Sequence, residues 1–443
     1  MPLRRAESAK PESGQSRDRK GAVGLGVEAI PASPTTLAAP DRPLPYGRGS
    51  DGARVPADAT RDASAARRFK NEILAELSRH PFRSAWWLRN AHGQTIWTYL
   101  FRRVRRAAFE STAVPTPDGD ELWLHRLHGD PLGPTALLLH GLGSSAQAPW
   151  IHGLTALLAP HGWNVAVMEF RSCGGRMNRT HRTYSAGDVD DVETSIAHLR
   201  AGGVRSIYLV GFSLGGSVAA RLLGLRGAAS GLSGAAASVC GAAAQVSRAV
   251  APVSGAEAQV SVSGAPVQDS RAVARVSGAA VVAAPFDLSK CAATISRALG
   301  GRYSRYFMQL LIPQALEKAR QFPGLIDVER LRTCRTMEEF DAIVTAKVFG
   351  YAGVDDYYAR CSCGPLMTRI RVPTLVIASR DDPFVPAESI PNEMLDSPWI
   401  IPQITRDGGH QGFIAGVWPG RARYWGELQV ARFLLACERA RLT

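Results

Sequence analysis

Residues 207–217 read Ile-Tyr-Leu-Val-Gly-Phe-Ser-Leu-Gly-Gly-Ser, and this stretch decides the fold. An apolar run of strand length enters the pattern Gly-x-Ser-x-Gly, and a run of small residues with helical character leaves it. The turn would force Ser213 into strained backbone geometry, and the strand and helix would approach too closely for a Cβ at Gly211 or Gly215. We therefore expect Ser213 to stand exposed at the carboxyl edge of a sheet. For the pentapeptide alone, the competing interpretation is a glycine-rich turn that matches by chance.

Candidates for a base and an acid lie downstream of this serine. A serine hydroxyl is a weak nucleophile at neutral pH and needs both groups beside it. Residues 372–378 predict a buried strand that ends just before Asp381 and Asp382, and residues 399–404 predict another strand, followed by a glycine-flanked loop with His410. Serine, acid and histidine are expected in this order after a strand–turn–helix of this kind. We therefore expect His410 to lie over Ser213.

An oxyanion hole is expected at the end of an earlier strand. Residues 135–139 form an apolar run that leads into His140-Gly141-Leu142. A strand followed by a His-Gly turn is where a second oxyanion donor belongs. We predict that the N–H groups of Leu142 and Leu214 form the hole, and that His140 holds the loop backbone rather than acting as a base.

Together these residues resemble the α/β-hydrolase superfamily and, within it, the AB hydrolase 4 family of serine esterases and lipases. The resemblance covers about residues 80–440, with one interruption. It is carried by residues 86–95, 139–145, 168–175, 211–216, 285–288, 382–384 and 408–410. The family's charge relay maps onto Ser213, Asp382 and His410. The step from Asp382 into Val-Pro favours this aspartate, and Asp381 remains the alternative.

The predicted fold class is α/β: an α/β-hydrolase fold whose mostly parallel central sheet is flanked by helices. Strand and helix patterns alternate from residue 135 onward, which indicates a parallel sheet. A hairpin over 109–128 predicts two antiparallel strands at the start of the sheet, with His125 and His128 on the surface. Residues 288–369 predict a helical cap over the nucleophile, although their apolar side chains could equally fill the cap's own core. The carboxylates there, such as Glu339, are expected to cap helices or to join the cap to the sheet.

The remaining segments set the expected domain boundaries. Residues 1–65 are rich in Pro, Gly and Arg without apolar periodicity, and we expect a disordered tail; a misassigned start codon is the alternative. Residues 66–108 are expected to dock onto a hydrolase domain that spans 109–443. Within this domain the tetrad Val-Ser-Gly-Ala recurs irregularly in residues 226–278, which predicts a low-complexity inserted loop.

The docking segment mixes aromatic and basic residues over 82–106. Trp and Tyr beside arginines could seat this stretch at a lipid surface. The alternative is that the aromatic side chains pack against the hydrolase body. The chain has no run of about 18 to 20 apolar residues, so any membrane contact is expected to be peripheral.

Charge and cysteine content exclude several classes of protein. The net charge is +13, but residues 1–110 alone hold 20 Lys and Arg against 11 Asp and Glu, so the excess is not a nucleic-acid face of the enzyme domain. Seven cysteines without ligand spacing predict reduced thiols, no structural disulfide and a cytoplasmic location. Catalysis by a serine, a histidine and an aspartate is expected to need no cofactor or metal.

The predicted reaction is hydrolysis of a carboxylic ester through an acyl-enzyme on Ser213. The substrates expected are short- to medium-chain acyl esters, acylglycerols or other lipid esters. An acyltransferase with the same triad and a catalytically silent binding protein stay open, whereas relatives with an aspartate nucleophile are excluded by the serine at position 213. The oligomeric state is left open.

Overall fold

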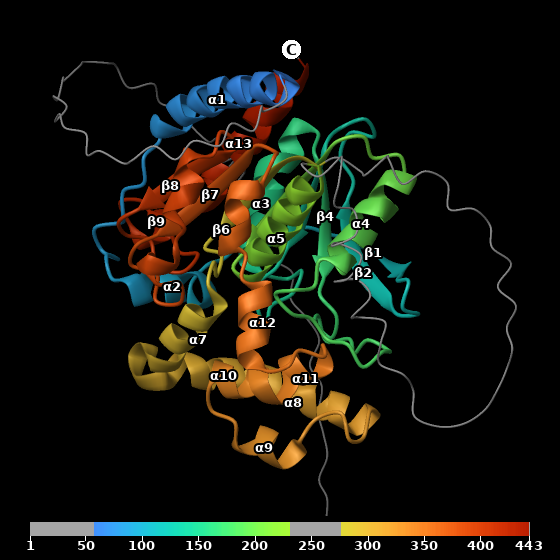
Figure 1. The fold of residues 1–443 in the computed structure, drawn as a ribbon. Coiled ribbons are helices and arrows are strands. Elements are labelled where there is room, and N and C mark those ends of the chain that lie inside the picture. Colours follow the sequence, from blue (N-terminus) through green and yellow to red (C-terminus); the bar gives the residue numbers. More distant parts are fainter. Residues whose placement is uncertain (1–56, 231–275, 443) are drawn as a thin grey trace, which may run out of the picture. The chain divides into compact units, whose positions relative to one another are not determined.

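The computed structural model describes residues 57–230 and 276–442. Its centre is an 8-stranded sheet in the order β1-β2-β4-β3-β5-β6-β7-β8 (Figure 1). The strands are β1 (Glu110–Pro115), β2 (Glu121–Leu127), β3 (Thr135–Leu139), β4 (Asn164–Glu169), β5 (Ile207–Phe212), β6 (Val276–Val282), β7 (Thr374–Ser379) and β8 (Ile400–Thr405). Neighbouring strands from β4 to β8 in this order run parallel, whereas β2 pairs antiparallel with both β1 and β4. The predicted fold class, a mostly parallel sheet that opens with an antiparallel hairpin, is confirmed.

The central strands are covered on both faces of the sheet. Every residue of β3, β4, β5 and β7 is buried, which explains why their sequences are continuous apolar runs rather than alternating patterns. Along β3 the side chains still alternate between the faces. Leu137 and Leu139 enter one hydrophobic core, and Ala136 and Leu138 enter the other. The sheet therefore separates two cores, each of which needs a layer of helices.

Two sets of helices supply these layers. One core is covered by α1 (Ala57–Ser78), α3 (Pro149–Leu158) and α13 (Trp425–Leu442). The other core is covered by α4 (Asp190–Ala201) and α5 (Leu214–Ser230). The parallel strands and the helices on both faces follow from the alternation of patterns in the sequence.

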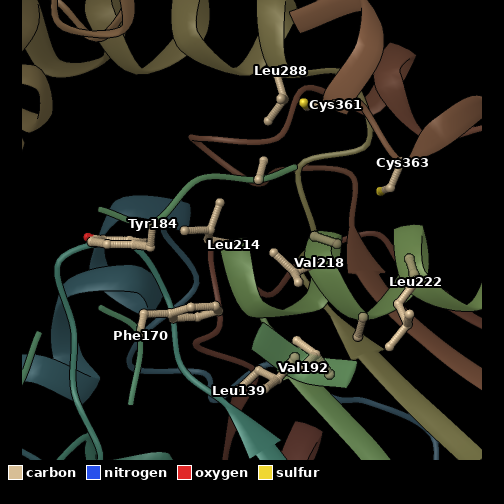
Figure 2. Close-up of a cluster of buried hydrophobic side chains, with 14 of the residues drawn as sticks. Leu139, Phe170, Tyr184, Val192, Leu214, Val218, Leu222, Leu288, Cys361 and Cys363 are labelled. Atoms are coloured by element: carbon tan, nitrogen blue, oxygen red, sulfur yellow. The ribbon is translucent and has the colours of Figure 1, made fainter. Parts of the chain in front are cut away.

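The helix α5 packs closely because one of its faces carries leucine and valine and another carries glycine. Figure 2 shows Leu214, Val218 and Leu222 along α5, and their spacing of four residues places them on one face. Gly224 lies against the short helix η4 (Gly364–Arg369), where a Cβ would come within 2.6 Å of Leu366 Cβ and Leu366 O. Only a residue without a side chain leaves room for this contact.

Between β6 and β7 the chain forms a helical segment over residues 288–369, in the range expected from the sequence (Figure 1). Its elements are α7 (Leu288–Arg297), η2 (Ala298–Gly301), α8 (Arg302–Gln321), α9 (Val328–Thr333), α10 (Met337–Phe340), the π-helix η3 (Asp341–Thr345), α11 (Ala346–Val348), α12 (Val354–Cys361) and η4 (Gly364–Arg369). Glu339 completes a capping box with Thr336, and Asp356 accepts a hydrogen bond from the Ala352 N–H. Glu339 therefore caps α10, as expected, whereas Asp356 binds the backbone just before the N-cap Gly353 of α12.

A buried lysine ties this helical segment to the sheet domain. Lys318 of α8 donates from Nζ to the carbonyl oxygens of Asn178 and Thr180, at 2.6 Å each. Asn178 donates to Asp120 at 2.6 Å, and Arg171 donates to the same carboxylate at 3.2 Å. A buried ammonium that loses its acceptors is costly. The helical segment is therefore attached to the sheet domain by directional hydrogen bonds as well as by apolar packing.

Two predicted boundaries need correction. Helix α1 begins at Ala57, inside the stretch 1–65 expected to be a tail, because Ile73 and Leu77 bury one of its faces against the core around α13. The predicted inserted loop, 226–278, overlaps regular structure at both ends. Helix α5 extends to Ser230, and β6 begins at Val276, where it pairs with β5. Residues 1–56 and 231–275 lie outside the described residues.

We expect Gly224→Ala to lower the free energy of unfolding by about 1–3 kcal/mol. Helix propensity alone would favour alanine by about 1 kcal/mol, but the added Cβ would meet Leu366, including its carbonyl oxygen, at 2.6 Å. Urea denaturation measures the difference. Gly353→Ala, at an open position before α12, is the matched control and should change stability by less than about 0.5 kcal/mol. A stabilised Gly224→Ala would show that propensity outweighs packing.

Candidate active site

Ser213 stands at a strained turn between β5 and α5. Its φ of 54° lies in the left-handed region that side chains rarely adopt. The Ser213 N–H donates to Val282 O of β6 at 2.8 Å and so holds the turn against the sheet. A Cβ on Gly211 would lie 2.2 Å from Gly215 O, and a Cβ on Gly215 would lie 2.3 Å from Leu139 O. The two glycines are therefore required by close backbone approach.

Three side chains from distant parts of the chain meet at this turn. His410 Nε2 lies 2.9 Å from Ser213 Oγ. His410 Nδ1 lies 2.9 Å from Oδ2 and 3.2 Å from Oδ1 of Asp382. Both His410 and Asp382 are buried. A proton on Nδ1 donates to the carboxylate, which leaves Nε2 free to accept the proton of the serine hydroxyl.

The two neighbouring aspartates have different tasks in this geometry. Asp382 Oδ1 accepts hydrogen bonds from the backbone N–H groups of Phe384 and Val385, at 2.8 and 3.0 Å, while the carboxylate faces the imidazole. Asp381 Oδ1 instead accepts the Gly409 N–H at 2.9 Å. Asp381 therefore holds the backbone of the histidine loop, and the carboxylate beside the imidazole is that of Asp382.

Helix α2 (Ala91–Leu100) fixes the histidine loop from the other side. The His410 N–H donates to Thr95 Oγ1 at 2.9 Å. Gln94 accepts the Ile414 N–H at 2.6 Å and donates to Ile414 O at 3.1 Å. Neither Gln94 nor Thr95 is predicted as a site residue from the sequence. The pattern Asn-x-His-x-Gln-Thr at residues 90–95, part of the stretch 86–95 that carries the family resemblance, could have indicated their role. The segment that precedes the hydrolase domain thus contributes to the site.

The oxyanion donors predicted from the sequence lie on two segments that meet beside Ser213, the loop after β3 and the start of α5. Leu214 is the first residue of α5, so its N–H has no carbonyl partner in a preceding helical turn. Gly141 passes so close that a Cβ there would be 3.4 Å from the Ser213 Cβ. The next turn is held by the Gly143 N–H, which donates to Tyr184 OH at 2.9 Å. No hydrogen bond of the Leu142 N–H is found within the described part of the chain.

Glu169, at the end of β4, contacts the loop after β3 that carries Leu142. This role of Glu169 is not predicted from the sequence. Its carboxylate lies 2.9 Å from His140 Nε2 and 3.3 Å from His125 Nε2, and it accepts the Ala146 N–H at 3.1 Å. Burial raises the pKa of this carboxyl, but its contacts with the two histidines and the Ala146 N–H outweigh burial and lower the pKa to about 2. His140 also donates from Nδ1 to Gly141 O at 2.9 Å, so it holds loop backbone as expected.

His125 corrects a further expectation. Its side chain is only 15% exposed because it packs against Glu169, whereas His128 is exposed at the surface as predicted.

A cavity extends from the oxyanion residues into the helical segment. Leu142 and Leu214 form part of its wall, and Figure 2 shows Leu214 and Tyr184 at this place. The other lining residues are Thr183, Tyr184, Ser185, Ala186, Leu311, Gln314, Ala315, Met337, Phe340, Asp341, Val344, Thr345 and Tyr357. Burial raises the pKa of Asp341 to about 6, although the hydroxyls of Thr345 and Tyr358 donate to it. The cavity is therefore mostly apolar, with one buried acid.

Within residues 57–230 and 276–442, no three His, Cys, Asp or Glu side chains gather in an arrangement that could hold a metal ion. The cysteines described there are free and buried, and Cys240 lies outside the described residues.

Comparisons with known proteins identify the family of the chain. Residues 136–417 match the model of a family described as the alpha/beta hydrolase family. YheT of Escherichia coli (strain K12), which is named as an esterase, is 32% identical over 333 residues, which cover 74% of this chain and 85% of YheT. Phospholipase ABHD3 of Homo sapiens is 24% identical over 349 residues, 76% of this chain and 75% of that protein. The monoacylglycerol lipase of Saccharomyces cerevisiae is 23% identical over 318 residues, 70% of this chain and 60% of the lipase.

We expect Glu169→Gln to reduce the loss of stability in acid. The folded protein lowers the pKa of Glu169 from 4.5 to about 2, so between these values it binds fewer protons than the unfolded chain. The carboxylate contributes about 3 kcal/mol to the free energy of unfolding above this range, and the contribution is lost as the pH falls toward 2. Urea denaturation at a series of pH values should therefore give a shallower acid slope for Glu169→Gln.

The same substitution should lower kcat about tenfold on a soluble ester, since it loosens the loop that carries Leu142, one of the two oxyanion donors predicted from the sequence. Glu110→Gln, which changes an exposed carboxylate on β1, should alter neither the acid slope nor kcat. A wild-type kcat for Glu169→Gln would contradict the positioning role of this residue.

Proposed function

Because the chain belongs to the alpha/beta hydrolase family, we propose that it is a serine hydrolase that cleaves carboxylic esters through Ser213, His410 and Asp382. The observation that carries the proposal is the unbroken chain of contacts from the Ser213 hydroxyl through the imidazole to the carboxylate, with 2.9 Å at each link. In this arrangement the base is within reach of the hydroxyl proton. The carboxylate holds the imidazole in the tautomer that can take it.

The proposed reaction has two steps. His410 takes the proton of Ser213 as the oxygen attacks the ester carbonyl, and then returns it to the departing alcohol, which leaves an acyl group on the serine. Water, deprotonated by the same imidazole, attacks the acyl group, and the acid departs as the serine recovers its proton. Asp382 stays ionised and stabilises the imidazolium that forms in each step.

The N–H groups of Leu142 and Leu214 are proposed to bind the negative oxygen of the tetrahedral intermediates. The approach of Gly141 to Ser213 and the position of Leu214 at the start of α5 support this assignment. Donors fixed by the fold need no reorganisation when the charge develops. The support of Glu169 beneath the loop is consistent with this need.

The substrate is proposed to be an acyl ester, in the range from short- to medium-chain esters to acylglycerols and other lipid esters. The three relatives carry the names esterase, phospholipase and monoacylglycerol lipase, which supports ester cleavage and leaves the alcohol part open. The cavity beside Leu142 and Leu214 is proposed to take the acyl chain, because apolar side chains of the core and the helical segment form most of its wall.

Hydrolysis of p-nitrophenyl butyrate tests the assignment of the three catalytic residues. Ser213→Ala should lower kcat/KM by at least about 10³-fold, and Asp382→Asn should lower it by about 10³- to 10⁴-fold, because the imidazole loses its orienting carboxylate. Asp381→Asn is the matched control, since Asp381 contacts only the backbone of the histidine loop in this geometry, and should cost less than about tenfold. Wild-type activity of Ser213→Ala would disprove the mechanism. An acyl group passed to added alcohol in preference to water would indicate a transferase.

Chain-length preference tests the acyl cavity. Ala315→Leu places three further carbon atoms in the cavity wall, and we expect kcat/KM for p-nitrophenyl octanoate to fall about tenfold or more, because the added volume displaces the distal methylenes. The rate on p-nitrophenyl acetate, which does not reach Ala315, serves as the internal control and should stay within about twofold. An equal loss on both esters would place the acyl chain elsewhere.

A further inference from the structure

Six large apolar side chains on one side of the molecule are more than half exposed. They are Trp86, Tyr99, Leu100, Phe101, Val417 and Trp418, and together they are called the aromatic patch below. Among the described residues, Leu132 and Leu442 are also more than half exposed but belong to other segments of the chain. Single exposed leucines are ordinary in soluble proteins, whereas a contiguous apolar patch marks an interaction surface.

Contacts between residues near 86 and near 417 join two distant segments of the chain into one surface. Trp86 Nε1 donates to Val417 O at 2.9 Å, and the rings of Trp86 and Trp418 lie 6.2 Å apart between centroids. The Trp97 ring packs at a tilt against the rings of Trp87 and Phe101, with centroids 4.7 and 4.6 Å apart, which links the loop before α2 to the end of that helix. Figure 1 shows α2 beside β9 (Ile414–Ala415), which precedes Val417. The patch is therefore held in place by its own hydrogen bonds and ring contacts.

The charge around the patch is of one sign. Residues 79–109 and 411–426 contain arginine but no Asp or Glu. The exposed arginines of these segments are Arg79, Arg83, Arg89, Arg103, Arg105, Arg106, Arg421 and Arg423, and none of these eight forms an ion pair with a described residue. Arg102 is different, because its guanidinium pairs with the buried Glu427 and lies over the Tyr424 ring, and so anchors the segment. The patch is thus bordered by free positive charge.

We propose that the aromatic patch and its arginines form a docking surface for an anionic lipid bilayer. Trp and Tyr favour the boundary between headgroups and acyl chains, and arginines beside them attract anionic headgroups. A second copy of the chain fits less well, because a symmetric contact would bring the arginines of both copies together. Docking would be peripheral, since no helix in the described ranges has the length and hydropathy needed to cross a bilayer.

The docking surface is mechanically joined to the active site. Helix α2, which ends in Tyr99 and Leu100, also carries Gln94 and Thr95, and these two side chains bind the loop of His410. A surface pocket beside this helix is lined by Ala91, His92, Thr294, Arg297, Ala298, Asp381 and Pro383. A bilayer on the patch would therefore face the side of the molecule where Asp381 and the histidine loop lie.

Vesicle binding tests the proposal separately from the proposed function. Ser213→Ala protein is used throughout, so that hydrolysis plays no part, and is sedimented with vesicles of phosphatidylcholine alone or with roughly a third phosphatidylglycerol. We expect at least about tenfold tighter binding to the anionic vesicles, weakened by added salt. Leu100→Ser with Trp418→Ser should reduce this binding by about tenfold or more. Leu132→Ser with Leu442→Ser, which alters equally exposed leucines outside the patch, is the matched control and should bind like the parent.

Three results would overturn the proposal. The first is no binding of the parent to anionic vesicles, and the second is equal loss in the patch and control variants. The third is self-association of the lipid-free parent, measured by analytical ultracentrifugation, that the patch variant abolishes while vesicle binding is unchanged. Activity of both double variants with Ser213 restored, measured on soluble p-nitrophenyl butyrate, shows that each is folded.

Discussion

The close backbone contact of Gly215 with the end of β3 is the constraint on which the rest of the site depends. A Cβ at Gly215 would meet Leu139 O at 2.3 Å, so α5 can start at this distance from the sheet only without a side chain there. The contact places Ser213 at the carboxyl edge of β5, beside the loop that follows β3. Both proposed oxyanion donors, Leu142 and Leu214, are positioned by the same pair of elements. Nucleophile and oxyanion loop are thus set by packing of backbone on backbone, which leaves little freedom for either to drift.

The histidine depends on a different set of contacts. His410 lies on a loop, and loops gain order only when their backbone groups find fixed partners. Thr95 and Gln94 of α2 supply partners at its start and end, and Asp381 supplies another. The segment before the hydrolase hairpin is therefore part of the active site. The same helix carries Tyr99 and Leu100 of the aromatic patch, so surface binding and catalysis would act on one element.

Buried charges connect the helical segment, the sheet and its loops, whose relative positions would be less well fixed by apolar packing alone. Lys318 binds carbonyl oxygens of the loop after β4. Glu169 contacts His125 and His140 beside the loop that carries Leu142. Such groups carry a high desolvation cost, which is offset only when their partners stay in place. They fix the relative positions of the helical segment, the sheet and the loops. The cavity beside Leu142 depends on that arrangement, because its wall belongs to the sheet domain on one side and to the helical segment on the other.

The sequence by itself determined the elements whose signals are local. The strand–turn–helix around Ser213, the parallel sheet, the hairpin and the helical segment over 288–369 follow from apolar periodicity and turn residues, which act over a few positions. The family pattern favoured Asp382 and left Asp381 as the alternative, and the tertiary structure places the Asp382 carboxylate beside His410 and the Asp381 carboxylate against the Gly409 N–H. The tertiary structure alone decided the roles of Glu169, Gln94 and Thr95, the start of α1 at Ala57 and the joining of residues near 86 and 417 into one surface. These features arise between segments far apart in the chain, where burial and partner geometry, rather than local pattern, set the energy.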